Sequence, residues 1–322
     1  MIRLKTKDMK FMKSCLLRKA AVMTGVLGAV WAAHAGLFQR TDVVADPVWV
    51  VHVDCDALKQ TVMGKALLTE LGKPGPQAKF DEIQSVFNVD PRKDLHGVTL
   101  YGAAKGEKDV VVVAYADFDA ARLVSIVEMN KDYLSSKAGT HTIHSWIDEK
   151  KAEKDGVKPR SYAAIYKGKV LVIGQTESRI AEALDVMDKR KPNLATSTQF
   201  GALGANGNGG FILGAARKLD LPGNDPGAAV LKQSKMFWLS AGETQGRAEV
   251  KLTLEAADAE TAKQMGDICR GLVAVLSLQT EQSEAVKLAK GISISQEDKA
   301  VTAKLSMPSE DVFAMIKAKI GK

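Results

Sequence analysis

The chain has 322 residues, and its 45 Lys and Arg side chains against 38 Asp and Glu give a formal net charge of +7. Residues 1–35 hold seven of the basic side chains and one acidic one, so the other 287 residues carry 38 basic and 37 acidic groups. Because residues 36–322 are nearly neutral, tight and salt-dependent binding of nucleic acid is excluded. A content of 46% hydrophobic residues excludes a disordered or fibrous chain.

The N-terminal segment has the pattern of a secretory signal. A basic region ending at Arg18-Lys19 precedes an uncharged run over residues 20–35, which closes with the A-x-A site Ala33-His34-Ala35. This run is shorter than the roughly 18 to 20 apolar residues of a spanning helix. We predict that residues 1–35 are a signal peptide whose cleavage releases a soluble protein without a transmembrane segment, periplasmic or extracellular. An uncleaved anchor is the alternative, and translation starts at Met1 or at Met12.

Strand and helix patterns alternate along the rest of the chain. A β pattern over residues 47–53 leads into a helix that Asp56 caps and that runs to about Leu71, and a second helix follows the Gly- and Pro-rich breaker. Helices are also predicted after Asp119, with apolar positions as far as Leu134, and after Thr176 or Ser178. The further strands of this half lie at 97–102, 110–115, 140–147, 161–166 and 169–174. Antiparallel hairpins alternating with amphipathic helices predict an α+β fold.

The order of these patterns recurs 139 residues later. That shift places Val98 on Phe237 and Asp119 on Asp258, so both segments indicate a strand, a turn, a strand and a capped helix. Further strands at 210–215, 291–295 and 299–307, and a helix capped by Ser309, complete the second set.

The repeat divides the chain into two predicted units. We place the first α+β unit at residues 36–192 and the second at residues 193–322, with a Gly- and Asn-rich linker at 193–210. Each unit is expected to have its own antiparallel sheet with helices packed on one face.

Three segments also resemble a loose group of exported bacterial proteins of unknown function that have this two-unit plan. They are the leader, residues 88–102 (NVDPRKDLHGVTLYG) and residues 166–195 (YKGKVLVIGQTESRIAEALDVMDKRKPNLA). The resemblance covers most of the chain after the leader. It implies neither an activity nor a role for any residue.

Local catalytic motifs are missing from the sequence. Gly64-Lys65 and Gly168-Lys169 lack the Ser or Thr of a P-loop, and no GxSxG, CxxC or HExxH motif occurs. We therefore predict a non-catalytic binding protein or envelope component, without a cofactor, whose partner is a protein or another envelope molecule. The alternative is an extracytoplasmic hydrolase whose site is assembled from distant residues, because such sites escape a motif search.

Metal and cysteine chemistry is weakly indicated. His52, Asp54 and Asp56 alternate at the end of one predicted strand and are the best candidate ligands, but Asp56 is better explained as a helix cap, so we predict no metal. Cys55 and Cys269 are predicted to be free thiols, although an exported protein could pair them.

One strand indicates a contact surface. Alternation over residues 140–147 places Ile143 and Ile147 on one face and His144 and Trp146 on the other. Because the aliphatic face is the expected core, we predict that His144 and Trp146 form a contact surface, either between the two units or with an outside partner. The apolar run at 271–278 is predicted to be a buried helix end between the units.

Overall fold

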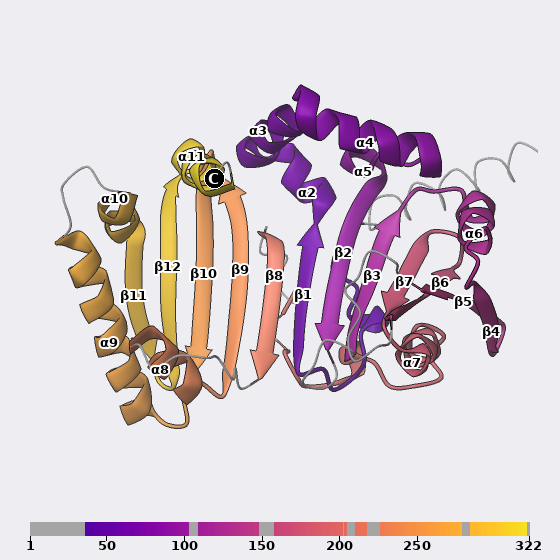
Figure 1. Ribbon diagram of the computed structural model, residues 1–322. Helices are drawn as coiled ribbons and strands as arrows, with labels where there is room; N and C mark the ends of the chain where they lie inside the picture. The colour runs from indigo at the N-terminus through magenta and orange to yellow at the C-terminus, as the bar shows by residue number, and fades with distance from the viewer. Residues whose placement is uncertain are drawn as a thin grey trace, which may run out of the picture.

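The structure is a computed structural model that describes residues 36–102, 109–147, 158–201, 203–204, 210–217, 226–278 and 284–320. The predicted signal peptide, residues 1–35, lies outside these ranges. Within them the strands form one twelve-stranded antiparallel sheet (Figure 1).

The sheet runs through both halves of the chain without a break. Its strand order is β11-β12-β10-β9-β8-β1-β2-β3-β7-β6-β5-β4. The strands are β1 (Trp49–Asp54), β2 (Leu95–Gly102), β3 (Val110–Ala116), β4 (Leu134–Ala138), β5 (His141–Ile147), β6 (Arg160–Tyr166), β7 (Val170–Gly174), β8 (Gly210–Arg217), β9 (Met236–Thr244), β10 (Arg247–Glu255), β11 (Ile292–Glu297) and β12 (Ala300–Pro308).

The α+β class with antiparallel strands is confirmed, but the prediction of a separate sheet in each unit is wrong. β1 and β8 pair antiparallel, with Trp49 opposite Ala216 and Val53 opposite Ile212. Each of these strands would otherwise be an open edge, and pairing them satisfies the backbone groups of both.

The strand order outward from this junction is the same in both directions over five strands. It reads β1-β2-β3-β7-β6 on one side and β8-β9-β10-β12-β11 on the other. Asp119 caps α6 (Ala120–Glu128) by accepting from the Arg122 N–H at 3.1 Å, and Asp258 caps α9 (Ala259–Ser277) by accepting from the Thr261 N–H at 2.7 Å. The 139-residue shift thus pairs topologically equivalent elements.

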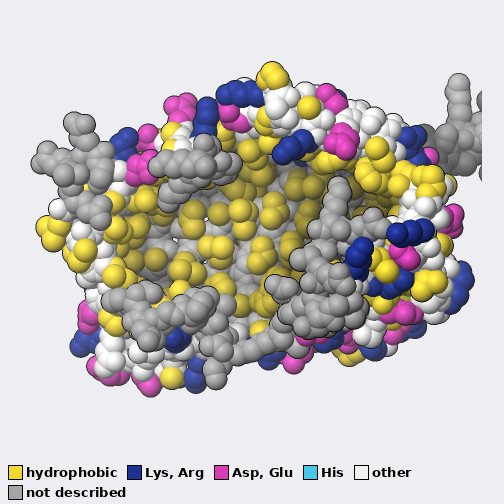
Figure 2. All heavy atoms as spheres, in the orientation of Figure 1, with side chains coloured by type: hydrophobic (Ala, Val, Ile, Leu, Met, Phe, Trp, Pro, Cys, Tyr) yellow, Lys and Arg dark blue, Asp and Glu magenta, His cyan; other side chains and the backbone are white. Residues whose placement is uncertain are grey.

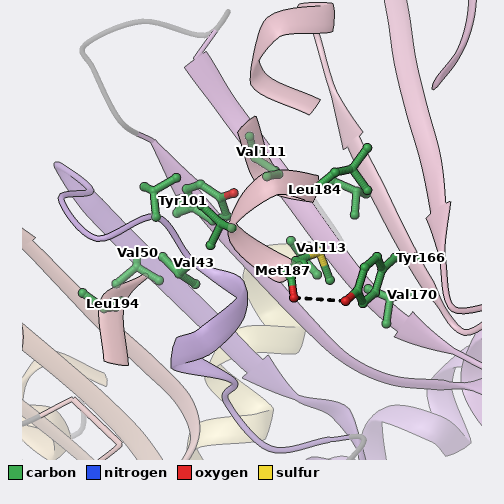
Figure 3. Close-up of a cluster of buried hydrophobic side chains, with 14 of the residues drawn as sticks. Val43, Val50, Tyr101, Val111, Val113, Tyr166, Val170, Leu184, Met187 and Leu194 are labelled. Atoms are coloured by element: carbon green, nitrogen blue, oxygen red, sulfur yellow. Dashed lines mark hydrogen bonds between the residues drawn. The ribbon is translucent and has the colours of Figure 1, made fainter. Parts of the chain in front are cut away.

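The larger core lies on one face of the first half of the sheet. α7 (Glu177–Met187) and the short helices η1 (Arg40–Asp42) and η3 (Leu194–Thr196) cover it. Figure 3 shows side chains from several strands meeting those of α7, where the Tyr166 hydroxyl donates to the Met187 carbonyl at 3.0 Å.

Part of the predicted linker belongs to this core. Leu194, Phe200 and Leu203 are 0%, 1% and 4% exposed. The Arg40 guanidinium donates to the carbonyl groups of these three residues and of Gln199, over 2.7 to 3.2 Å. The described part of 193–210 is therefore a packed connection, because the half-buried Arg40 guanidinium satisfies several of its backbone acceptors.

A smaller core lies on the other face of the sheet, in the second half. α8 (Pro226–Gln233), α9 and α10 (Glu284–Gly291) pack there, and Met265 of α9 is fully buried with Leu254 and Val301 of the strands. The helices of the two cores thus cover opposite faces of one sheet, one face in each half.

The remaining helices lie along one end of the strands (Figure 1). They are α2 (Cys55–Gln60), α3 (Val62–Leu71), α4 (Pro74–Phe87), α5 (Pro91–Asp94) and α11 (Ser309–Ile320). Asp54 caps α2 in place of the predicted Asp56, and Thr61 separates α2 from α3. α3 packs against α11 from the other half, where Lys317 pairs with Glu70 at 2.8 Å.

Candidate binding surface

One face of the sheet presents an apolar surface that spans the junction of the two halves. Directly paired residues point to the same side of a sheet, so the register places Val51, Leu100, Val112 and Ile173 in one row with Leu239 and Leu252. The next row holds Val53, Val98, Ala114, Leu171, Ile212, Ala241 and Val250. All these side chains are half-buried. Figure 2 shows this face as a hollow lined by hydrophobic side chains.

Helices bound this surface at its ends. The row that contains Phe237 and Leu254 is packed against α8 and α9, and Leu252 at the end of the neighbouring row also packs against this smaller core. At the other end of the strands, a shallow cleft between α3 and α11 is lined by apolar side chains that include Met63, Ala66 and Phe313. We call the hollow between these helices the open apolar face.

The opposite side of the same strands has a different character in each half. In the first half it carries the larger core, with Val113 and Val172 fully buried. In the second half it carries polar side chains, including Ser240, Lys251 and Thr302. In the second half, therefore, the apolar composition of the open face is not shared by the opposite side of the sheet.

The C-terminal part of α9 adds exposed apolar groups at one margin. Leu272, Val275 and Leu278 are 37%, 61% and 84% exposed. The prediction that residues 271–278 form a buried helix end is therefore wrong. α9 packs on the smaller core as far as Cys269, and its last turns extend past that core.

The structure separates the two faces of β5 as predicted. Ile143 is 1% exposed in the larger core, whereas His144 and Trp146 are half-buried on the side of the open apolar face. The Tyr133 hydroxyl lies 2.9 Å from His144 Nδ1, and burial lowers the pKa of His144. Five strands lie between β5 and β8, so these residues do not lie at the junction of the two halves. A contact with an outside partner stays a prediction.

The three candidate metal ligands are engaged separately. His52 is 1% exposed; its Nε2–H donates to the Gly36 carbonyl at 2.8 Å, and its Nδ1 lies 2.9 Å from the Thr99 hydroxyl. Burial lowers the pKa of His52, which favours the neutral ring. Asp54 caps α2, and Asp56 turns away to His96. In the described parts of the chain, no three His, Cys, Asp or Glu side chains are placed so that together they could hold a metal ion.

A polar cluster missed by the sequence analysis surrounds His96. Its Nδ1 lies 2.9 Å from Asp56 and its Nε2 3.1 Å from Asp117, and Asp117 also pairs with Lys169 at 2.9 Å. The Lys169 ammonium and then His96 keep the pKa of Asp117 low against the effect of burial. No catalytic site is evident here or elsewhere in the described residues.

Cys55 and Cys269 are free and half-buried in the structure. Burial raises the pKa of both, which keeps them protonated and weakly reactive. Among the described helices, none is both long enough and apolar enough to cross a bilayer.

A sequence signal for the open apolar face was present but ambiguous. β3 reads VVVVAYA and β1 reads WVVHVD, so successive positions are apolar on both sides. Such strands are usual where a sheet is covered on both faces. The sequence could not show that the described residues leave one of these faces only half-buried.

Comparisons with known proteins reveal fold similarity alone. No family model and no curated protein matches the chain. Crystal form III of TP0453, a Treponema protein, has 10% sequence identity and a TM-score of 0.49, covering 88% of this chain and 98% of that one. Crystal form I has 9% identity and a TM-score of 0.46, with 88% and 97% covered. The similarity to exported two-unit proteins inferred from the sequence stays a prediction.

Proposed function

We propose that the protein is an exported, non-catalytic binding component of the cell envelope, built from two related units, and that it holds the acyl chains of a lipid on the open apolar face. The observation that carries this proposal is the pair of neighbouring rows of half-buried aliphatic side chains across β7, β3, β2, β1, β8, β9 and β10. Contiguous apolar surface of this kind is uncommon on a soluble monomer and marks a binding site.

The chemistry of the face favours an acyl chain over a protein. Protein interfaces carry roughly one hydrogen bond per 100–200 Å² together with a polar rim. The central rows offer no polar side chain, and the backbone groups beneath them are used in the strand ladders. A hydrocarbon chain needs no such partner, and lipids are the abundant apolar molecules of an envelope.

A lipid-binding assay with matched variants tests the proposal. The chain starting at Gly36 would be purified without detergent, extracted for lipid analysis by mass spectrometry, and titrated with a fluorescent fatty acid. Leu239→Asn changes the open face, and Ser240→Asn makes a similar change at the next residue, which points to the polar side. We expect Leu239→Asn to weaken binding by about tenfold, since a buried Leu contributes about 1.5 kcal/mol or more, and Ser240→Asn to have no effect.

Three results would contradict the proposal. One is the absence of both bound lipid and fatty-acid binding, and another is an equal effect of the two variants. The third is a concentration-dependent dimer that Leu239→Asn dissociates, because a second copy would then occupy the face.

A further inference from the structure

A buried carboxylate lies at the end of β1. Asp54 is 7% exposed, and its Oδ1 accepts the Ala57 N–H at 2.8 Å as the cap of α2. No ion pair to Asp54 is found within the described ranges. Burial of an ionised carboxylate is costly unless a cation or several donors compensate for the lost water. One N–H leaves most of its acceptor capacity unused.

Gly36 is packed directly against this carboxylate. A Cβ built on Gly36 would lie 2.5 Å from Asp54 Oδ1 and 3.2 Å from the Cβ of Asp56, so only glycine permits this approach. The carbonyl of Gly36 is fixed by the buried His52, and the Phe38 ring lies against His52 with 5.4 Å between centroids. Gly36 is itself buried.

We propose that removal of the leader completes this site, because the new α-ammonium group of Gly36 pairs with the Asp54 carboxylate. A signal peptidase hydrolyses the Ala35–Gly36 peptide bond with one water, leaving a carboxylate on Ala35 and an amino group on Gly36. That amino group is protonated at neutral pH. Its nitrogen is bonded to the Cα that faces Asp54, so it supplies the missing cation and charge-assisted donors. Processing therefore strengthens the fold, because the uncleaved chain has a neutral amide at this point.

Two N-terminal forms of the purified protein test the pairing. One begins at Gly36 and the other at Ala35, and the second form moves the charge one residue, about 3.8 Å, along the chain. We expect the melting temperature to be about 2 to 4 °C higher for the Gly36 form. The difference should vanish in Asp54→Asn. It should persist in the control Asp46→Asn, since Asp46 is exposed and pairs with Arg217 at 3.0 Å.

The reactivity of the α-amine gives a second measurement that needs no folded variant. Acetic anhydride should label the Gly36 amine at least about tenfold more slowly in the native protein than in urea, because the paired ammonium is buried and protonated. Equal melting temperatures, a difference that survives Asp54→Asn, or equal labelling in both states would overturn the proposal.

The inference depends on cleavage before Gly36 and is independent of lipid binding. N-terminal sequencing of the exported protein decides that premise separately. A start at any other residue would remove the ammonium from this site and overturn the proposal for the cellular protein.

Discussion

Glu243 connects the two halves through the N-terminus of α3, and its removal should loosen their docking. Glu243 at the end of β9 accepts the N–H groups of Val62 and Met63 at 2.7 and 3.1 Å. The first N–H groups of a helix have no partner within the helix, and a carboxylate there also interacts favourably with the helix dipole. We predict that Glu243→Ala destabilises the protein more than Glu243→Gln.

The magnitude follows from these two bonds. Loss of a helix cap costs about 0.5–2 kcal/mol, and hydrogen bonds to a charged group contribute about 1.5–3 kcal/mol when buried. Because Glu243 is partly exposed, we expect Glu243→Ala to lower the free energy of unfolding by about 2 kcal/mol. Glu243→Gln keeps one acceptor oxygen and should cost about 1 kcal/mol.

The effect should depend on pH. Burial opposes ionisation of Glu243, but the two backbone donors outweigh it and hold its pKa below the usual value. A lowered pKa contributes stability that is present above the unfolded value, about 4.3, and is lost as the pH falls through the folded value. The free energy difference between wild type and Glu243→Gln should therefore shrink below about pH 4.

Urea unfolding at pH 7 and at pH 3.5 measures both effects. Glu249→Ala is the matched control, because Glu249 forms an exposed pair with Lys304 at 3.3 Å that should contribute less than about 1 kcal/mol. If Glu243→Ala were as mild as Glu249→Ala at pH 7, the carboxylate would not hold α3 as the geometry indicates.

Four other predictions concern single sites. Because the pKa of His52 is lowered in the folded state, only the unfolded state binds a proton at His52 just below about pH 6.5. The free energy of unfolding should therefore fall by up to about 1.4 kcal/mol per pH unit as the pH drops, and calorimetry of His52→Gln should show no such pH dependence from this site. Tyr101→Phe should leave the free energy of unfolding in urea unchanged or raise it, because the buried Tyr101 hydroxyl has no hydrogen-bond partner in the described residues. Tyr115→Phe should lower it, because that variant loses the 2.8 Å hydrogen bond to the Asp42 carboxylate. Trp146→Ala should reduce capture of an envelope partner in a pull-down more than His144→Ala, and unchanged capture would remove that contact surface. N-terminal sequencing of the exported protein should begin at Gly36, and an intact leader in washed membranes would instead indicate an anchor.

Local chemistry predicted most elements and several of their ends. Asp119 and Asp258 cap helices because their short carboxylates reach the N–H groups three residues ahead, and alternation in β5 placed Ile143 in the core. Errors occurred where local signals compete. Leu134 continued a helical pattern, but α6 ends at Glu128 and residues 134–138 form the edge strand β4.

The sequence by itself determined the elements, their repeated order and the apolar character of the strands, because each depends on neighbours within one turn or one hairpin. Only the tertiary structure decided that β1 and β8 join two predicted sheets into one, since strand pairing depends on which edges meet. It also decided which apolar positions the described residues bury fully and which they leave half-buried. Val51 and Val113 are equally apolar in the sequence, but helices cover the face of Val113 and leave Val51 half-buried, because the direction in which each helix leaves the sheet is a property of the whole fold.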